Sequence, residues 1–71
     1  MNDYVIFWRN DATKSRSFLV RDGGSHHWEP EKNGGLELAT GFASKSEAAS
    51  FRRSLGHSMR RQAKIERRGG V

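Results

Sequence analysis

The sequence predicts an α+β protein in which a small antiparallel sheet of three to four strands precedes one long C-terminal amphipathic basic helix, in the order ββββα. Short β-branched and aromatic runs separated by Gly-rich turns fill residues 4–40. A helix start signal follows them, with apolar residues at helical spacing behind it. We expect residues 1–56 to form a compact α+β domain that includes the first half of the helix, and residues 57–71 to form a basic helical extension or tail.

The first strand is expected over residues 4–9, because YVIFWR is β-branched and aromatic. Alternate side chains of a strand point to opposite faces, and both sets are apolar here, which predicts a central strand covered at least in part on both sides. One set is Tyr4, Ile6 and Trp8, and the other is Val5 and Phe7. Turn-forming residues 10–15 lead to a second strand over residues 16–21, so these two strands should form an antiparallel hairpin.

Two glycine-containing turns separate the next elements. Asp22-Gly23-Gly24 predicts a tight turn, because glycine adopts positive φ at little cost. A short third strand over residues 25–29 should end at Pro30, which cannot donate a hydrogen bond to a sheet. Asn33-Gly34-Gly35 is the second turn, and the apolar–polar alternation of residues 36–40 predicts a fourth strand.

The helix is expected to begin after Ser44, which forms a capping box with Glu47. Placed at about 100° per residue, the apolar side chains of this region share one stripe, and the cations gather beside it. The stripe consists of Ala48, Phe51, Leu55, Met59 and Ala63. We therefore favour one helix over about residues 45–67 with a bend at Gly56, although Ile65 lies off the stripe.

A second reading of the same region ends the helix at Leu55 and leaves a disordered basic tail behind it. In both readings residues 69–71 are expected to be unstructured.

Positive charge is concentrated in the last third of the chain. The net charge is +5, and residues 45–71 hold eight Lys and Arg residues against two Glu, whereas residues 1–44 hold five against six acidic residues. This favours an acidic partner, either nucleic acid (DNA or RNA) or an acidic protein surface. Because the chain lacks cysteine, disulfides and zinc–thiolate sites are excluded, and we expect a cytoplasmic protein.

The basic helix face is the main candidate binding site, because arginine matches phosphate geometry and lysine adds charge. The expected nucleic-acid contacts are Arg52, Arg53, Arg60, Arg61, Lys64, Arg67 and Arg68. The alternative is a solvated face that only keeps a small protein in solution. Mixed charges are usual on such a face, yet opposite charges are almost absent here, which favours binding.

Other chemistries find little support in the sequence. His26 and His27 are adjacent, so on a strand they point to opposite faces and cannot share a metal ion. No catalytic constellation or cofactor motif is visible, so we expect a non-enzymatic protein without metal or cofactor. The apolar helix face is too modest for membrane binding. Trp28 and His26, in a short polar strand, are possible contacts to a partner.

Several local patterns together resemble short phage-encoded accessory proteins, many of which have no assigned function. The patterns are the opening Tyr4-Val5-Ile6 strand, a second strand that ends in Asp22-Gly23-Gly24, Trp28, and the A-x-x-F-x-S-x-x-E-A entry to the helix over residues 39–48. The resemblance covers about residues 4–55 and carries no catalytic residues. It implies a small protein that binds and modulates a larger one, often of the host.

Two functions therefore follow as hypotheses. In the first, a small protein contacts nucleic acid through its C-terminal Arg-rich helix, mainly at phosphates and with little sequence specificity. In the second, a phage-type modulator or inhibitor binds a host protein of the nucleic-acid machinery, in the cytoplasm of a bacterial host. Edge strands of so small a sheet could also pair across a homodimer.

Overall fold

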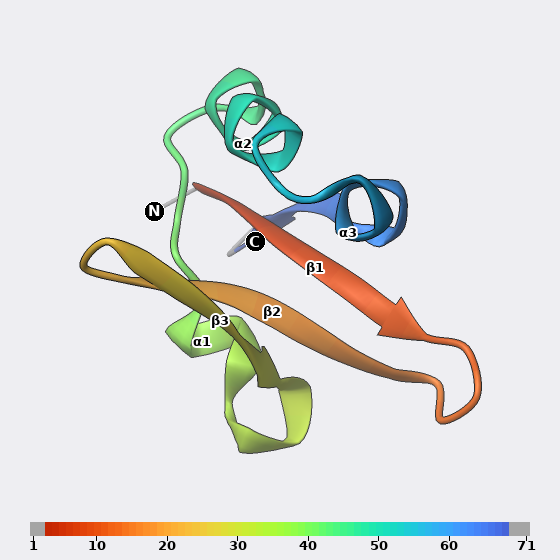
Figure 1. Cartoon of the computed structure of the whole chain (residues 1–71). Coiled ribbons are helices and arrows are strands. Elements are labelled where there is room, and N and C mark those ends of the chain that lie inside the picture. The colour runs from red at the N-terminus through yellow and green to blue at the C-terminus, as the bar shows by residue number, and fades with distance from the viewer. Residues whose placement is uncertain (1–2, 69–71) are drawn as a thin grey trace.

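The computed structural model describes residues 3–68, drawn as a cartoon in Figure 1. The elements are β1 (Asp3–Asn10), β2 (Ser15–Asp22), β3 (Ser25–Pro30), the 3₁₀ helix η1 (Glu31–Asn33), α1 (Gly35–Leu38), α2 (Lys45–Arg53), α3 (His57–Gln62) and β4 (Lys64–Arg68). The α+β class and the antiparallel sheet are confirmed. The expectation that residues 69–71 are unstructured lies outside the described residues.

The four strands form one antiparallel sheet in the order β3-β2-β1-β4. Helices α2 and α3 lie on one side of this sheet and α1 lies on the other (Figure 1). The prediction of a central first strand is confirmed, because β1 pairs with β2 on one edge and with β4 on the other. Its adjacent residues Val5 and Ile6 are both fully buried, one in each of the two core clusters.

The core is divided by the sheet into two clusters of buried side chains. The larger cluster, on the side of α2 and α3, contains Ile6, Leu19, Phe42, Ala48, Leu55 and Ala63. The smaller cluster, on the side of α1, contains Val5, Phe18 and Ala39. Because so short a chain buries little apolar surface, each of these side chains contributes a large share of the stability.

The second and third strands form the expected hairpin around the Asp22–Ser25 turn. Gly23 has φ of 63°, the left-handed conformation that glycine adopts without steric cost. Asp22 pairs with Ser25 at the end nearest the turn, and Ser17 pairs with Pro30 at the other end, where β3 stops as predicted.

The predicted fourth strand over residues 36–40 is wrong. Gly35–Leu38 form the short helix α1, which begins where Gly35 lies against the carbonyl oxygens of Glu29 and Pro30. The chain then crosses the sheet: the amide of Thr40 donates to the carbonyl of Leu19 in β2, and Phe42 exchanges two backbone hydrogen bonds with Tyr4 in β1. The pairs between β1 and β2 run from Phe7 and Phe18 to Asn10 and Ser15, so the crossing segment lies between the other ends of these two strands.

The predicted long helix over residues 45–67 is also wrong. The chain forms α2, a turn around Gly56 with φ of −56° and ψ of 154°, and α3. The prediction that these apolar side chains face the core is confirmed, because Ala48, Leu55 and Ala63 are all buried in the larger cluster. Two short helices can follow the surface of the twisted sheet, whereas one straight helix would carry its second half away from it.

Residues 64–68 form strand β4, and neither a helix nor a disordered tail. Ile65 pairs with Ile6, which places both side chains on the same face of the sheet. The pairing satisfies the second edge of β1, whose backbone groups would otherwise lie unpaired beside the core. The last described element is therefore an edge strand of the same sheet.

The start of α2 agrees with the capping prediction. The hydroxyl of Ser44 accepts a hydrogen bond from the amide of Glu47 at 3.1 Å. The Glu47 carboxylate accepts from the amide of Ala43 at 3.2 Å rather than from that of Ser44, one residue from the expected donor.

Candidate nucleic-acid interface

Two of the seven predicted contact residues are used by the fold itself. Arg68 donates from Nε to Oδ1 of Asp3 at 2.9 Å and pairs through Nη2 with Oδ2 of the same carboxylate. Its Nη1 donates to the carbonyl oxygens of Leu36 and Ala39, at 2.8 and 2.7 Å. The hydrogen bonds from Arg68 hold the pKa of Asp3 below its usual range, against the opposing effect of burial.

Arg52 also has a structural contact. Its Nε donates to the carbonyl oxygen of Ala63 at 2.7 Å, and the side chain is half-buried. This hydrogen bond joins the end of α2 to the residue that precedes β4. Arg52 and Arg68 therefore hold the C-terminal elements against the rest of the fold. All three guanidinium nitrogens of Arg68 donate to partners in the range 3–68, whereas Arg52 donates there through Nε alone.

The other five predicted cations are exposed but do not share one face. Arg53 ends α2, Arg60 and Arg61 lie on α3, and Lys64 and Arg67 lie on β4. Lys64 pairs with Phe7 and Arg67 pairs with Tyr4, so the two β4 cations point to opposite faces of the sheet. The continuous basic face of a single helix is absent from residues 3–68, because that helix is replaced by two helices and a strand.

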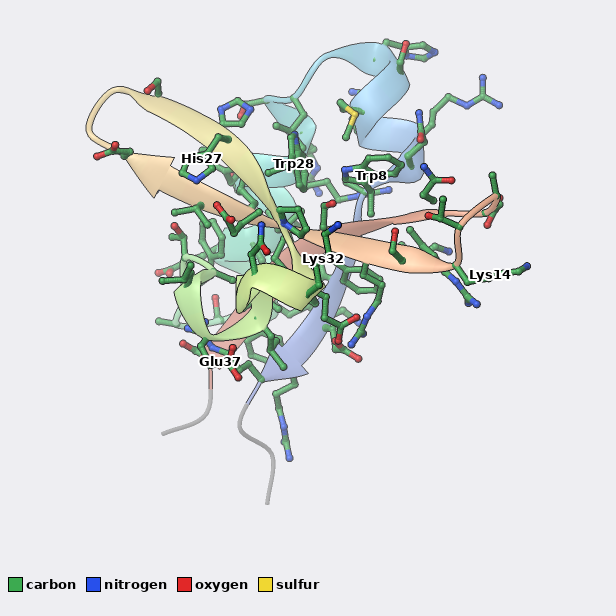
Figure 2. The ribbon with its side chains drawn as sticks, turned by 90° about the horizontal axis from the view of Figure 1, so that it is seen from below. Trp8, Lys14, His27, Trp28, Lys32 and Glu37 are labelled. Atoms are coloured by element: carbon green, nitrogen blue, oxygen red, sulfur yellow. The ribbon has the colours of Figure 1, made fainter. Side chains whose placement is uncertain are left out.

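Two of these cations meet two others that the sequence did not single out. Arg61 and Lys64 join Arg9, near the end of β1, and Lys14, in the β1–β2 turn. We call these four residues the basic track. Lys14 projects from the tip of the hairpin (Figure 2). Its position is fixed locally, because its amide donates to the carbonyl of Asn10 at 2.7 Å and its φ is 61°.

Three hollows in the surface follow one another along the basic track. The first, of about 490 Å³, is lined by Phe7, Arg9, Lys14, Arg16 and Lys64. The second, of about 400 Å³, is lined by Arg9, Asp11, Arg61, Gln62 and Lys64. The third, of about 370 Å³, is lined by His57, Ser58, Arg61 and Gln62. Neighbouring hollows share two lining residues, so the track runs from the hairpin to α3.

The charge of the track is largely uncompensated. None of its four cations makes an ion pair with any residue in the range 3–68, and Asp11 is the one carboxylate in the linings of these hollows. Arg16 differs, because Glu31 and Glu66 neutralise it at 2.6 and 3.1 Å. The hydrogen bond between Arg16 and Glu31 lowers the pKa of this carboxyl and raises that of the guanidinium.

Trp28 and His26 occupy the opposite side of the molecule from Phe7. Trp28 is half-buried and packs against the larger core cluster, so its ring serves mainly the core. His26 is exposed, and its ring lies edge-on to Trp28 and to Phe51, with centres 6.4 and 6.0 Å apart. Figure 2 shows Trp28 and Trp8 on the side of the sheet that faces the helical pair.

Within residues 3–68, no three His, Asp or Glu side chains lie close enough together to hold a metal ion. None of the helices in the same range has the length and apolarity needed to span a membrane. No family model, curated protein or solved structure matches the chain. The relation to phage-encoded accessory proteins therefore stays a prediction.

Proposed function

We propose that this protein binds nucleic acid through the basic track of Arg9, Lys14, Arg61 and Lys64. The observation that supports the proposal best is the convergence of unpaired cations from β1, the β1–β2 turn, α3 and β4 on linked surface hollows. Four unpaired cations repel one another in the free protein, and phosphates relieve that repulsion while releasing counterions. Of the contact residues predicted from the sequence, this proposal retains Arg61 and Lys64. The binding surface is no longer one helix face but the end of the sheet where β1 ends and β4 begins.

The binding is expected to be of low sequence specificity. Lysine and arginine side chains on a surface track contact the phosphate backbone, which positions a protein without reading bases. No helix among residues 3–68 has the length and free basic face that insertion into a major groove would require. The protein is therefore expected to coat or accompany nucleic acid rather than select a site.

The test is affinity for a labelled 20-nucleotide DNA and for a 20-base-pair duplex, measured by fluorescence anisotropy across a salt series. In the track variant, Arg9, Lys14, Arg61 and Lys64 are all changed to Gln. We expect its affinity to fall for both DNAs and its salt dependence to flatten, by about 0.7–0.9 in the log–log slope for each contact removed.

The chain supplies a matched control. Lys32, Lys45, Arg53 and Arg67 are also two lysines and two arginines, are exposed, and line none of the three hollows. Their change to Gln lowers the net charge by the same amount. Equal losses in the two variants would reject the track as the site and leave only a general charge effect.

Protein binding is a second candidate function, supported by a groove between β2 and α2. Two hollows of about 450 and 240 Å³ share Arg21, Phe51 and Ser54, and His26 lines the smaller one. The guanidinium of Arg21 lies 5.1 Å from the centre of the Phe51 ring and makes no ion pair with any residue in the range 3–68. Arginine and aromatic side chains are enriched at protein interfaces.

This groove fits the hypothesis of a modulator that binds an acidic host protein. The experiment is a pull-down from bacterial lysate with the native protein and the Arg21→Glu variant. A host protein retained by the native chain and lost with Arg21→Glu supports this function. Retention of the same proteins by both rejects it.

A further inference from the structure

The ring of Phe7 is only half-covered by the part of the chain that the structure describes, residues 3–68. On this side of the sheet, Leu36 of α1 and Ala39, which follows α1, pack against Val5 and Phe18, and α1 lies below β2 and β3 in the view of Figure 1. Phe7 lies at the margin of that cluster, is half-buried, and lines the 490 Å³ hollow. The basic track thus contains an aromatic ring as well as cations. Electrostatic binding of phosphates does not require an aromatic ring.

The guanidinium of Arg16 lies over this ring and over the ring of Phe18. Its guanidinium carbon lies 5.4 Å from the centre of the Phe7 ring and 5.1 Å from that of Phe18. Hydrogen bonds of 3.1 and 2.6 Å to Glu31, with another of 3.1 Å to Glu66, fix the plane of the guanidinium. Because its charge is already paired, Arg16 contributes here mainly a planar group, which nucleobases accept as a stacking partner.

We infer that the basic track takes single-stranded nucleic acid in preference to duplex, with a base stacked in the hollow formed by Phe7 and Arg16. The inference rests on the proposed function and adds the class of ligand. Arg9, Lys14 and Lys64 line the same hollow and would hold the phosphates on either side of the stacked base. A duplex keeps its bases stacked inside, so it would contact only the cations and gain nothing from Phe7.

The dimensions agree with this reading. A volume of about 490 Å³ lies within the usual range of small-ligand sites, which favours one nucleotide in the hollow. The adjoining hollow carries Arg61 and the smaller polar side chain of Gln62 and has no aromatic lining residue, so it suits backbone rather than base. The single-stranded nucleic acid would therefore bind with one base stacked in the first hollow and with its following phosphates along the track toward α3.

The test compares a 20-nucleotide oligothymidine with a 20-base-pair duplex, using the native protein and Phe7→Leu. Leucine keeps an apolar side chain over Phe18 but removes the ring. We expect tighter binding of oligothymidine than of duplex by the native protein. In Phe7→Leu, oligothymidine affinity should fall about tenfold while duplex affinity stays within about twofold, because a stacked base is lost only from the single strand.

Two further variants separate stacking from folding. Phe7→Tyr keeps the ring and should retain the native oligothymidine affinity, whereas Tyr4→Leu removes a half-buried ring from the other side of the sheet and should not affect it. Thermal denaturation of each variant establishes that it is folded at the temperature of the measurement.

The outcomes distinguish the two proposals. Unchanged oligothymidine affinity in Phe7→Leu, or an equal fall for both DNAs, overturns the stacking inference while the track function stands. Failure of the native protein to bind either DNA near physiological salt overturns both.

Discussion

The two ends of the sheet both carry cations, but the fold uses them in opposite ways. Where β1 begins and β4 ends, Arg68 is bound to Asp3 and to two carbonyl oxygens, which makes this the ion-paired end. Where β1 ends and β4 begins, the basic track has no ion pair within residues 3–68. The comparison teaches that the partners of an arginine, more than the number of arginines in a segment, indicate whether it serves the fold or a ligand.

The largest effect is expected at Arg68. Arg68→Ala removes the donors to a carboxylate and two carbonyl oxygens at once, and we expect the free energy of unfolding to fall by about 2–3 kcal/mol. Urea denaturation measures it. Arg67→Ala, one residue away and exposed, should change stability by less than about 0.5 kcal/mol. Similar losses for the two would break the distinction between the two ends.

The next effect concerns α1, which supplies one carbonyl acceptor of Arg68, Leu36, and precedes the other, Ala39. A Cβ at Gly35 would overlap the carbonyl oxygens of Glu29 and Pro30, so Gly35→Ala must displace α1 and should cost about 2 kcal/mol. Gly56 has open space around it, and Gly56→Ala should cost less than about 1 kcal/mol. Thermal denaturation of the two variants gives the comparison, and a tolerated Gly35→Ala would show that α1 is not held closely against β3.

The pH dependence of stability tests the ion-paired end without disturbing its packing. Asp3→Asn should lower the free energy of unfolding by about 1.5 kcal/mol at neutral pH, because Arg68 loses its charged acceptor. Because the Asp3 pKa is lowered in the folded state, its contribution is present above the unfolded pKa of about 3.9 and is lost as pH falls through the folded value. The native and variant curves should therefore converge in acid. Parallel curves down to the lowest accessible pH would contradict the assignment.

The smallest effect is expected at Arg52. Arg52→Met keeps the length of the side chain and removes one hydrogen bond to Ala63, which should cost about 1 kcal/mol. Arg53→Met, the exposed neighbour, should be close to neutral. Chemical denaturation of this pair tests whether adjacent arginines of α2 differ as their contacts indicate.

Local features of the fold could be predicted from the sequence, and the pairing of distant segments could not. The first hairpin, the Gly23 turn, the end of β3 at Pro30 and the cap at Ser44 each depend on neighbouring residues. Strand β4 depends on β1, more than 50 residues earlier in the chain. Two signals pointed to it: Ile65 lies off the helical stripe, and a strand that is apolar on both faces is typical of the interior of a sheet, where it has a neighbour on each edge.

The candidate site was predictable in part for the same reason. Arg61 and Lys64 were identified from the density of charge, but charge alone could not separate them from Arg52 and Arg68, whose acceptors come from other elements. Arg9 and Lys14 belong to the first hairpin, and the sequence around them indicates a turn and no binding site. Only the antiparallel pairing of β1 with β4 brings the end of one strand beside the start of the other.

The most direct test of the central claim is a backbone amide NMR titration of the native protein with oligothymidine. The account predicts the largest chemical-shift changes at residues 7–16 and 61–64, with little change at Arg52, Arg53 and Arg68. Largest changes along α2, or at the ion-paired end, would contradict it, because binding would then follow the arginines that the fold already uses.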